Sequence, residues 1–235
     1  MRSVDSWQSK LLGDLVLVDL ESLPENTERD FPFSYIDISS VSEGKITLPP
    51  SRTSFGEAPS RARRIVHRRD VLMSTVRPNL KAFAYFDHTD ENCVASTGFA
   101  VLTARPEIDP KFVLYTILSE AVAAQIEAYV AGSNYPAIAS SAVRCLRVLV
   151  PPFAEQTKIA EILSTVDQAI EQTEALIAKQ QRIKTGLIED LLTRGIDEQG
   201  NLRSEETHRF KDSPLGRIPV EWEINTLNGC VRDGS

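Results

Sequence analysis

The spacing of apolar positions changes along this chain from strand-like to helix-like. Four short β-branched or aromatic runs, bounded by Pro, Asn, Asp or Gly, predict strands at 15–20, 65–76, 81–86 and 98–104. Between 111 and 130, apolar residues recur at steps of three and four, which predicts one helix of about five turns. A last strand is expected at 143–152, where Pro151-Pro152 ends it. Residues 1–150 therefore predict a mixed α/β (α+β) globular domain.

A different pattern follows Pro151-Pro152. From Glu155 to Arg194 the chain holds no Pro and a single Gly, and apolar residues repeat over about four heptads, as in a coiled coil. We assign 151–196 to one long coiled-coil-type spacer helix. Its expected contact positions are Ile159, Ile162, Val166, Ile170, Leu176, Ile183 and Leu187.

The length of this helix indicates that it needs a partner. About 39 residues at 1.5 Å each span roughly 58 Å, which exceeds what a compact domain can cover. The apolar face is therefore expected to pack against another helix. The alternative is that the face packs on its own domain, although the distal half lies too far along the chain for that.

The remaining residues are polar and contain several helix-breaking residues. Pro214, Gly216 and Pro219 predict a linker at 197–221 without regular structure. A faint repeat connects the two ends of the chain, because Trp7 and Trp222 are each followed five residues later by a leucine. We interpret 222–235 as the start of a second domain like the first.

Composition excludes several classes of protein. The 42% of hydrophobic and 25% of charged residues are ordinary for a folded soluble protein, and no apolar run approaches the roughly 18 residues of a membrane helix. The N-terminus lacks the apolar core of a signal peptide, so we expect a cytoplasmic protein without a membrane partner. Three distant cysteines, Cys93, Cys145 and Cys230, indicate neither a disulfide framework nor a zinc site. The sequence also lacks a Walker loop, GxGxxG, GxSxG and an Asn-Pro-Pro-aromatic motif, which predicts no catalytic residue, cofactor or metal.

The net charge of −7 argues against a nucleic-acid partner, but the distribution of charge does not. Residues 52–81 carry eight basic and two acidic side chains, and a local basic surface is what matters for DNA. Arginine suits this role because its planar fork grips phosphate or the edge of guanine. The candidate DNA-binding residues of this region are Arg52, Arg61, Arg63, Arg64, Arg68, Arg77, Asn79 and Lys81. The alternative is a solvated loop whose arginines pair with acidic residues.

A second candidate for DNA contact is the small, polar and aromatic segment 132–136. Ser133, Asn134 and Tyr135 suit a loop that enters a groove. The same residues, preceded by Gly132, also suit a simple helix stop, and both interpretations stay open.

Three stretches resemble one known family. The stretch 148–196 closely resembles a conserved region in specificity subunits of type I restriction-modification systems, through Pro151, Pro152, Phe153, Glu155, Gln156, Ile159, Leu163, Asp167, Leu191, Leu192 and Gly195. The stretch 67–86 is similar to a strand entry in the family's target recognition domain, with Asp70, Ser74, Arg77 and Pro78 in place but Arg69 where glycine is usual. The stretch 213–223 is similar to the entry into a second recognition domain.

The resemblance implies a function and a set of partners. Residues 1–150 would be a target recognition domain that reads one half of a bipartite site in double-stranded DNA. Two long antiparallel helices would set the distance between two such domains. The subunit would be non-catalytic and would dock methylation (M) subunits, which use S-adenosylmethionine, and ATP-dependent restriction (R) subunits. If the chain ends at Ser235, a second copy of itself would supply the other helix.

Two other classes of function remain open from the residues alone. One is a coiled-coil adapter that assembles protein partners without DNA, and the other is an enzyme with a dispersed active site. Salt-sensitive binding to duplex DNA separates the first class from a specificity subunit.

Overall fold

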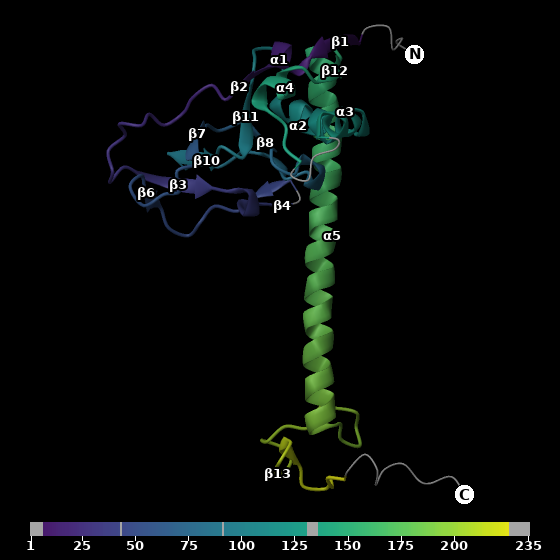
Figure 1. The fold of residues 1–235 in the computed structure, drawn as a ribbon. Helices are drawn as coiled ribbons and strands as arrows, with labels where there is room; N and C mark the ends of the chain where they lie inside the picture. Colours follow the sequence, from purple (N-terminus) through teal and green to yellow (C-terminus); the bar gives the residue numbers. More distant parts are fainter. Residues whose placement is uncertain (1–6, 43, 91, 131–135, 226–235) are drawn as a thin grey trace, which may run out of the picture. The chain divides into compact units, whose positions relative to one another are not determined.

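The computed structural model describes residues 7–42, 44–90, 92–130 and 136–225 (Figure 1). The chain divides into two compact units, Met1–Thr165 and Val166–Ser235. The long helix α5, Phe153–Arg194, begins in the first unit and ends in the second.

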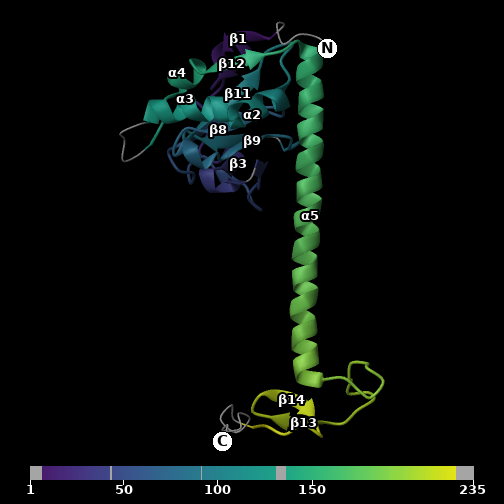
Figure 2. The same cartoon turned by 90° about the vertical axis from the view of Figure 1, so that its right-hand side faces the viewer.

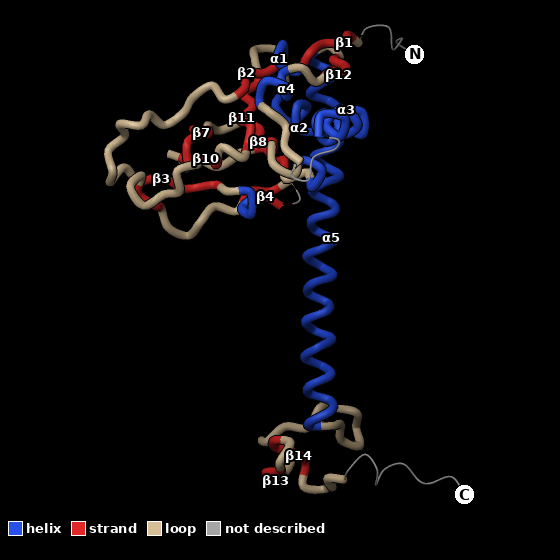
Figure 3. Tube along the Cα trace, in the orientation of Figure 1, coloured by secondary structure: helices blue, strands red, loops and turns tan. Residues whose placement is uncertain are grey.

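Two four-stranded sheets form the centre of the first unit (Figure 3). One has the order β2 (Val16–Val18), β11 (Phe99–Ala104), β8 (Val71–Ser74) and β9 (Phe83–Tyr85), and every pair in it is antiparallel. The other has the order β6 (Thr53–Ser54), β3 (Pro32–Ile36), β10 (Cys93–Ser96) and β7 (Ala62–Val66), in which only β3 and β10 are parallel. Two short antiparallel pairs complete the set: β1 (Gln8–Leu11) with β12 (Arg147–Val150), and β4 (Val41–Ser42) with β5 (Lys45–Ile46).

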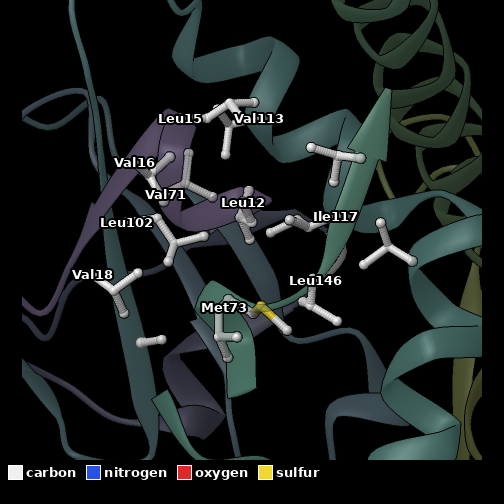
Figure 4. Packing of buried hydrophobic residues seen from close by; sticks show 14 of the residues in the cluster. Leu12, Leu15, Val16, Val18, Val71, Met73, Leu102, Val113, Ile117 and Leu146 are labelled. Atoms are coloured by element: carbon white, nitrogen blue, oxygen red, sulfur yellow. The ribbon is translucent and has the colours of Figure 1, made fainter. Parts of the chain in front are cut away.

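The sheet that contains β8 has a hydrophobic core on each face. Along β8, Val71 and Met73 belong to one cluster and Leu72 to the other, as the alternation of side chains along a strand requires. The first cluster packs the short helix α1 (Leu12–Leu15) and Ile117 against the sheet (Figure 4). Both faces of this sheet are therefore buried. The unit combines sheets with helices, so the mixed α/β fold class expected from the sequence is confirmed.

Residues 111–130 form two helices, not the single helix predicted from their apolar spacing. These are α2 (Pro110–Leu118) and α3 (Glu120–Val130), bent by 62°. Ser119 lies between them in an extended conformation, donates its hydroxyl to the carbonyl of Thr116 (2.7 Å) and accepts the amide of Val122 (3.4 Å). Its side chain thus satisfies backbone groups at both helix ends, which makes the break favourable.

No single helix among the described residues has the length and apolarity to cross a membrane. The helices α2 and α3 reach that length and apolarity only together, as a bent pair.

All five predicted strands are shorter in the structure, and two of the predicted runs also contain other structure. The run 65–76 contains the end of β7 and the whole of β8, separated by a turn in which Arg69 has φ of 77°. This is the left-handed conformation that glycine adopts most easily, and glycine is the residue that the resemblance implies at this position. The run 143–152 begins in the short helix α4 (Ser140–Arg144), and only Arg147–Val150 is a strand.

The second unit contains a β-hairpin, so the expectation that 197–221 has no regular structure is wrong. Strands β13 (Phe210–Ser213) and β14 (Gly216–Pro219) pair antiparallel around a two-residue turn (Figure 2). Pro214 lies in that turn, where it breaks no ladder. Ser213 closes the turn by donating to the carbonyl of Gly216, whose φ is 99°.

Trp222 covers the end of α5 within the second unit. A side chain at Gly195 would place its Cβ 2.6 Å from the indole, and Gly195 has φ of 67°. Glycine is therefore required there both for the helix stop and for the approach of the tryptophan.

Candidate nucleic-acid interface

The basic residues of 52–81 separate into different structural roles. Arg64 is held inside the domain, because its guanidinium lies 3.1 Å from the carboxylate of Asp19, whose side chain is 4% exposed. Asp19 also accepts the amide of Val101 (3.0 Å) and the hydroxyl of Ser140 (2.6 Å). Arg64 therefore links β7 to the loop after β2, and its ion pair with Asp19 is a contact within the domain.

Lys81 is also engaged within the first unit. Its ammonium lies 3.3 Å from the carbonyl of Leu118 at the end of α2 and 3.7 Å from the carboxylate of Glu120. A cation is stabilised at a helix C-terminus, so this side chain ties the β8–β9 connection to α2.

Arg61 directly precedes β7, and Arg63 is the second residue of that strand. Arg61 is exposed and donates from Nε to the hydroxyl of Tyr35 (3.3 Å). Arg63 is half-buried, and its guanidinium lies 4.7 Å above the ring of Phe55. Such stacking holds the arginine stem while leaving its charge available to an anion.

Arg68 and Arg52 are exposed at the surface of the first unit. Arg68 pairs with Asp87 at 2.9 Å, with side chains 61% and 54% exposed. A pair this exposed is weak and readily exchanged, so Arg68 could transfer from the carboxylate to a phosphate.

Arg77 and Asn79 belong to the connection between β8 and β9. This connection contains the 3-10 turn η3 (Pro78–Leu80), and both side chains are exposed. Val76 pairs with Ala137, and the amide of Arg77 donates to the carbonyl of Pro136 (2.8 Å). Two candidate regions distant in sequence are thus brought together at 76–77 and 136–137, although Ser133, Asn134 and Tyr135 themselves lie outside the described residues.

Leu80 is the residue that sequence analysis did not single out. It is 67% exposed beside Asn79. From sequence alone, a leucine is expected to be buried. Leu80 becomes a candidate contact residue only because the structure shows that its apolar side chain is exposed.

Asp70 supports the turn at Arg69 and has no access to solvent. It accepts the amide of His67 (2.7 Å) and the hydroxyl of Thr103 (2.7 Å), and it is 2% exposed. Burial is the largest effect on its carboxyl and raises its pKa above the ordinary value of 3.8.

Two observations on the described residues concern potential metal ligands and a buried thiol. Among them, no group of three or more His, Cys, Asp or Glu side chains is placed to hold a metal. Burial raises the pKa of the Cys93 thiol to about 11, so this thiol is protonated at neutral pH.

The Glu-Gln pair after Pro151-Pro152 joins α5 to the domain. Glu155 accepts the indole N–H of Trp7 (3.2 Å). Gln156 is 2% exposed; it accepts the amide of Asp109 (3.0 Å) and donates to the carbonyl of Pro151 (3.0 Å). These two residues of the conserved region therefore anchor the first turn of the long helix.

The predicted seam of α5 is largely exposed. Ile159 is half-buried near the domain, whereas side chains farther along are about half exposed: Ile162 54%, Val166 50%, Ile170 51%, Leu176 55%, Ile183 44% and Leu187 51%. Packing on the chain's own domain therefore does not cover this face.

These features define a class: a mixed α/β domain with exposed arginines, followed by one long helix with an uncovered apolar seam. The family model of the type I restriction modification DNA specificity domain matches residues 5–180. The chain belongs to this family, and the resemblance seen in the sequence is confirmed.

One sequence relative and two solved structures show the same relationship. A protein of Methanocaldococcus jannaschii, provisionally named the MjaX type I restriction enzyme specificity subunit, is 26% identical over 240 residues, 95% of this chain and 52% of its own. The crystal structure of the HsdS subunit from Thermoanaerobacter tengcongensis has a TM-score of 0.66 and 26% identity, covering 87% of this chain and 53% of that one. A structure from work on complex assembly and conformational transition of the type I R-M system has a TM-score of 0.68, with the same identity and coverage. The chain thus spans about half the length of the relatives it matches.

Proposed function

We propose that this chain is a DNA sequence-recognition component of a type I restriction-modification complex and reads one half of a bipartite duplex site. The observation that carries the proposal is the family match over 5–180, which includes both the domain with its exposed arginines and the beginning of α5. In this role the chain acts in the cytoplasm without catalysis of its own. It docks M subunits that use S-adenosylmethionine and R subunits that use ATP.

The proposed DNA-facing residues are the arginines of the first unit that are not held by a buried carboxylate. Arg61, Arg63 and Arg77 are the principal cations of this set, and Arg52 and Arg68 extend it. Arg64 and Lys81 are proposed to support this surface and not to contact DNA directly, since each is already engaged with backbone or carboxylate groups. Ser133, Asn134 and Tyr135, which lie outside the described residues, stay part of the proposed DNA-binding set.

The long helix is proposed to pair with a second α5 in antiparallel orientation. Soluble proteins rarely expose apolar patches as large as the stripe on this helix, and a twofold pairing would bury the same stripe of both copies. Thr173 and Gln180 lie near the middle of the seam, where they could meet across a twofold axis and select the register.

Binding to duplex DNA tests this function against the adapter alternative. The purified chain should bind duplex DNA with an affinity that falls steeply as salt rises, because each neutralised phosphate releases counterions. Methylation should appear only after addition of an M subunit and S-adenosylmethionine. Salt-independent binding, or no binding at any salt concentration, would favour an adapter of protein partners.

A further inference from the structure

The connection between β8 and β9 has an unusual backbone. Arg77 (φ 48°, ψ 52°) and Lys81 (φ 50°, ψ 37°) both adopt the left-handed conformation, and they flank the single turn Pro78–Leu80. Side chains as long as these rarely adopt this conformation, and such positions concentrate at functional sites. The strained backbone therefore marks the exposed side chains of this turn as candidates for a functional contact.

Buried residues and hydrogen bonds fix the backbone of this turn. Pro78 and Thr75 are buried, and the hydroxyl of Thr75 donates to the carbonyl of Gly98 (2.9 Å). The amide of Arg77 donates to Pro136, and the ammonium of Lys81 is bound to the end of α2. The three side chains at the tip are consequently carried on a pre-organised support.

The tip presents three different chemistries to solvent. Arg77 is a cation whose side chain has no hydrogen-bond or ion-pair partner among the described residues, Asn79 offers a donor and an acceptor, and Leu80 is 67% exposed. A cavity of about 490 Å³ lies beside them, lined in part by Ile38, Val41 and Ala82. An exposed leucine next to an apolar hollow and an amide is suited to a ligand with a methyl group and a polar edge.

We propose that residues 77–80 form a base-reading tip that recognises an adenine–thymine pair in the major groove of DNA. The Asn79 amide matches the N6 and N7 edge of adenine, Leu80 contacts the 5-methyl group of thymine, and Arg77 binds a phosphate. This inference rests on the proposed DNA-recognition function and adds to it the residues that select sequence.

The experiment uses duplexes selected from a randomised pool by the full, unsubstituted chain. Asn79→Ala should relax the preference for adenine at one position and weaken binding to the selected duplex roughly 5- to 150-fold. Replacing thymine by deoxyuridine in that duplex should weaken the unsubstituted chain about fourfold and leave Leu80→Ala unaffected. Leu149→Ala, which truncates a 58% exposed leucine on β12, is the matched control and should behave as the unsubstituted chain.

The outcomes separate this inference from the proposed function. Failure of the unsubstituted chain to bind duplex DNA would overturn both. Binding in which Asn79→Ala and Leu80→Ala keep the same affinity and the same selected sequence would overturn the base-reading tip alone. Equal sensitivity to deoxyuridine in Leu80→Ala and in the unsubstituted chain would likewise remove Leu80 from the contact with thymine.

Discussion

The guanidinium of Arg64 lies 3.1 Å from the carboxylate of Asp19, across a distance of 45 positions in the sequence. Asp19 itself has φ of 55° and receives two further hydrogen bonds, from Val101 and Ser140. One arginine of a basic cluster therefore stabilises the domain, while its neighbour Arg63 stacks on an aromatic ring.

This pair leads to a prediction about stability. Arg64→Ala leaves the buried Asp19 carboxylate without its cation and should lower the free energy of unfolding by about 2–4 kcal/mol. Urea denaturation measures the change. Arg68→Ala is the control: its partner is exposed, so its loss should cost under about 1 kcal/mol. Equal effects of the two substitutions would show that the Asp19 pair contributes no more than a surface pair.

A second prediction concerns DNA affinity. The double substitution Arg61→Ala and Arg63→Ala should weaken binding to duplex DNA and reduce the salt dependence by roughly two phosphate contacts. Anisotropy titrations at several salt concentrations measure both quantities. Arg182→Ala removes an exposed cation from α5 and should leave both unchanged. If the double variant keeps the slope of the unsubstituted chain, β7 does not face DNA.

A third prediction follows from the buried carboxyl of Asp70. Because burial raises its pKa in the folded state, protonated Asp70 stabilises the fold below the ordinary pKa of 3.8, and this contribution is lost as pH rises through the folded value. Asp70→Asn does not titrate. The unsubstituted chain should therefore lose stability relative to Asp70→Asn as pH rises above 3.8.

Urea unfolding of both proteins at each pH measures this difference. Other titrating groups are common to the two proteins and largely cancel. A relative gain in stability for the unsubstituted chain as pH rises would mean that the hydrogen bonds from His67 and Thr103 outweigh the effect of burial.

A fourth prediction concerns the exposed seam. Ile162→Glu and Leu176→Glu should convert a helix-paired dimer into monomers, since each places a charge in the apolar contact, while the recognition domain stays folded. Sedimentation velocity measures the mass, and circular dichroism checks folding. Gln181→Glu, on the same helix but outside the predicted seam, should remain dimeric. An unsubstituted chain that sediments as a monomer at micromolar concentration would contradict the proposed pairing.

The long helix could be predicted from the sequence almost to its ends. The predicted span 151–196 compares with Phe153–Arg194 in the structure. Its apolar period, the preceding Pro151-Pro152 and the left-handed Gly195 are all local signals, so they act over a few residues of chain. The mixed fold class and the resemblance at Glu155 and Gln156 were accessible for the same reason.

The roles of individual arginines were decided only by tertiary structure. Arg63 and Arg64 are neighbours of the same type, and no local pattern distinguishes them. Their difference arises because β7 places Arg64 beside Asp19, which is 45 positions away in the sequence, and Arg63 beside Phe55, which lies outside the strand. The bend at Ser119 and the exposure of Leu80 also depend on which surfaces the folded chain leaves available. Side-chain partners are set by contacts between distant segments, whereas the helix was set by the spacing of its own residues.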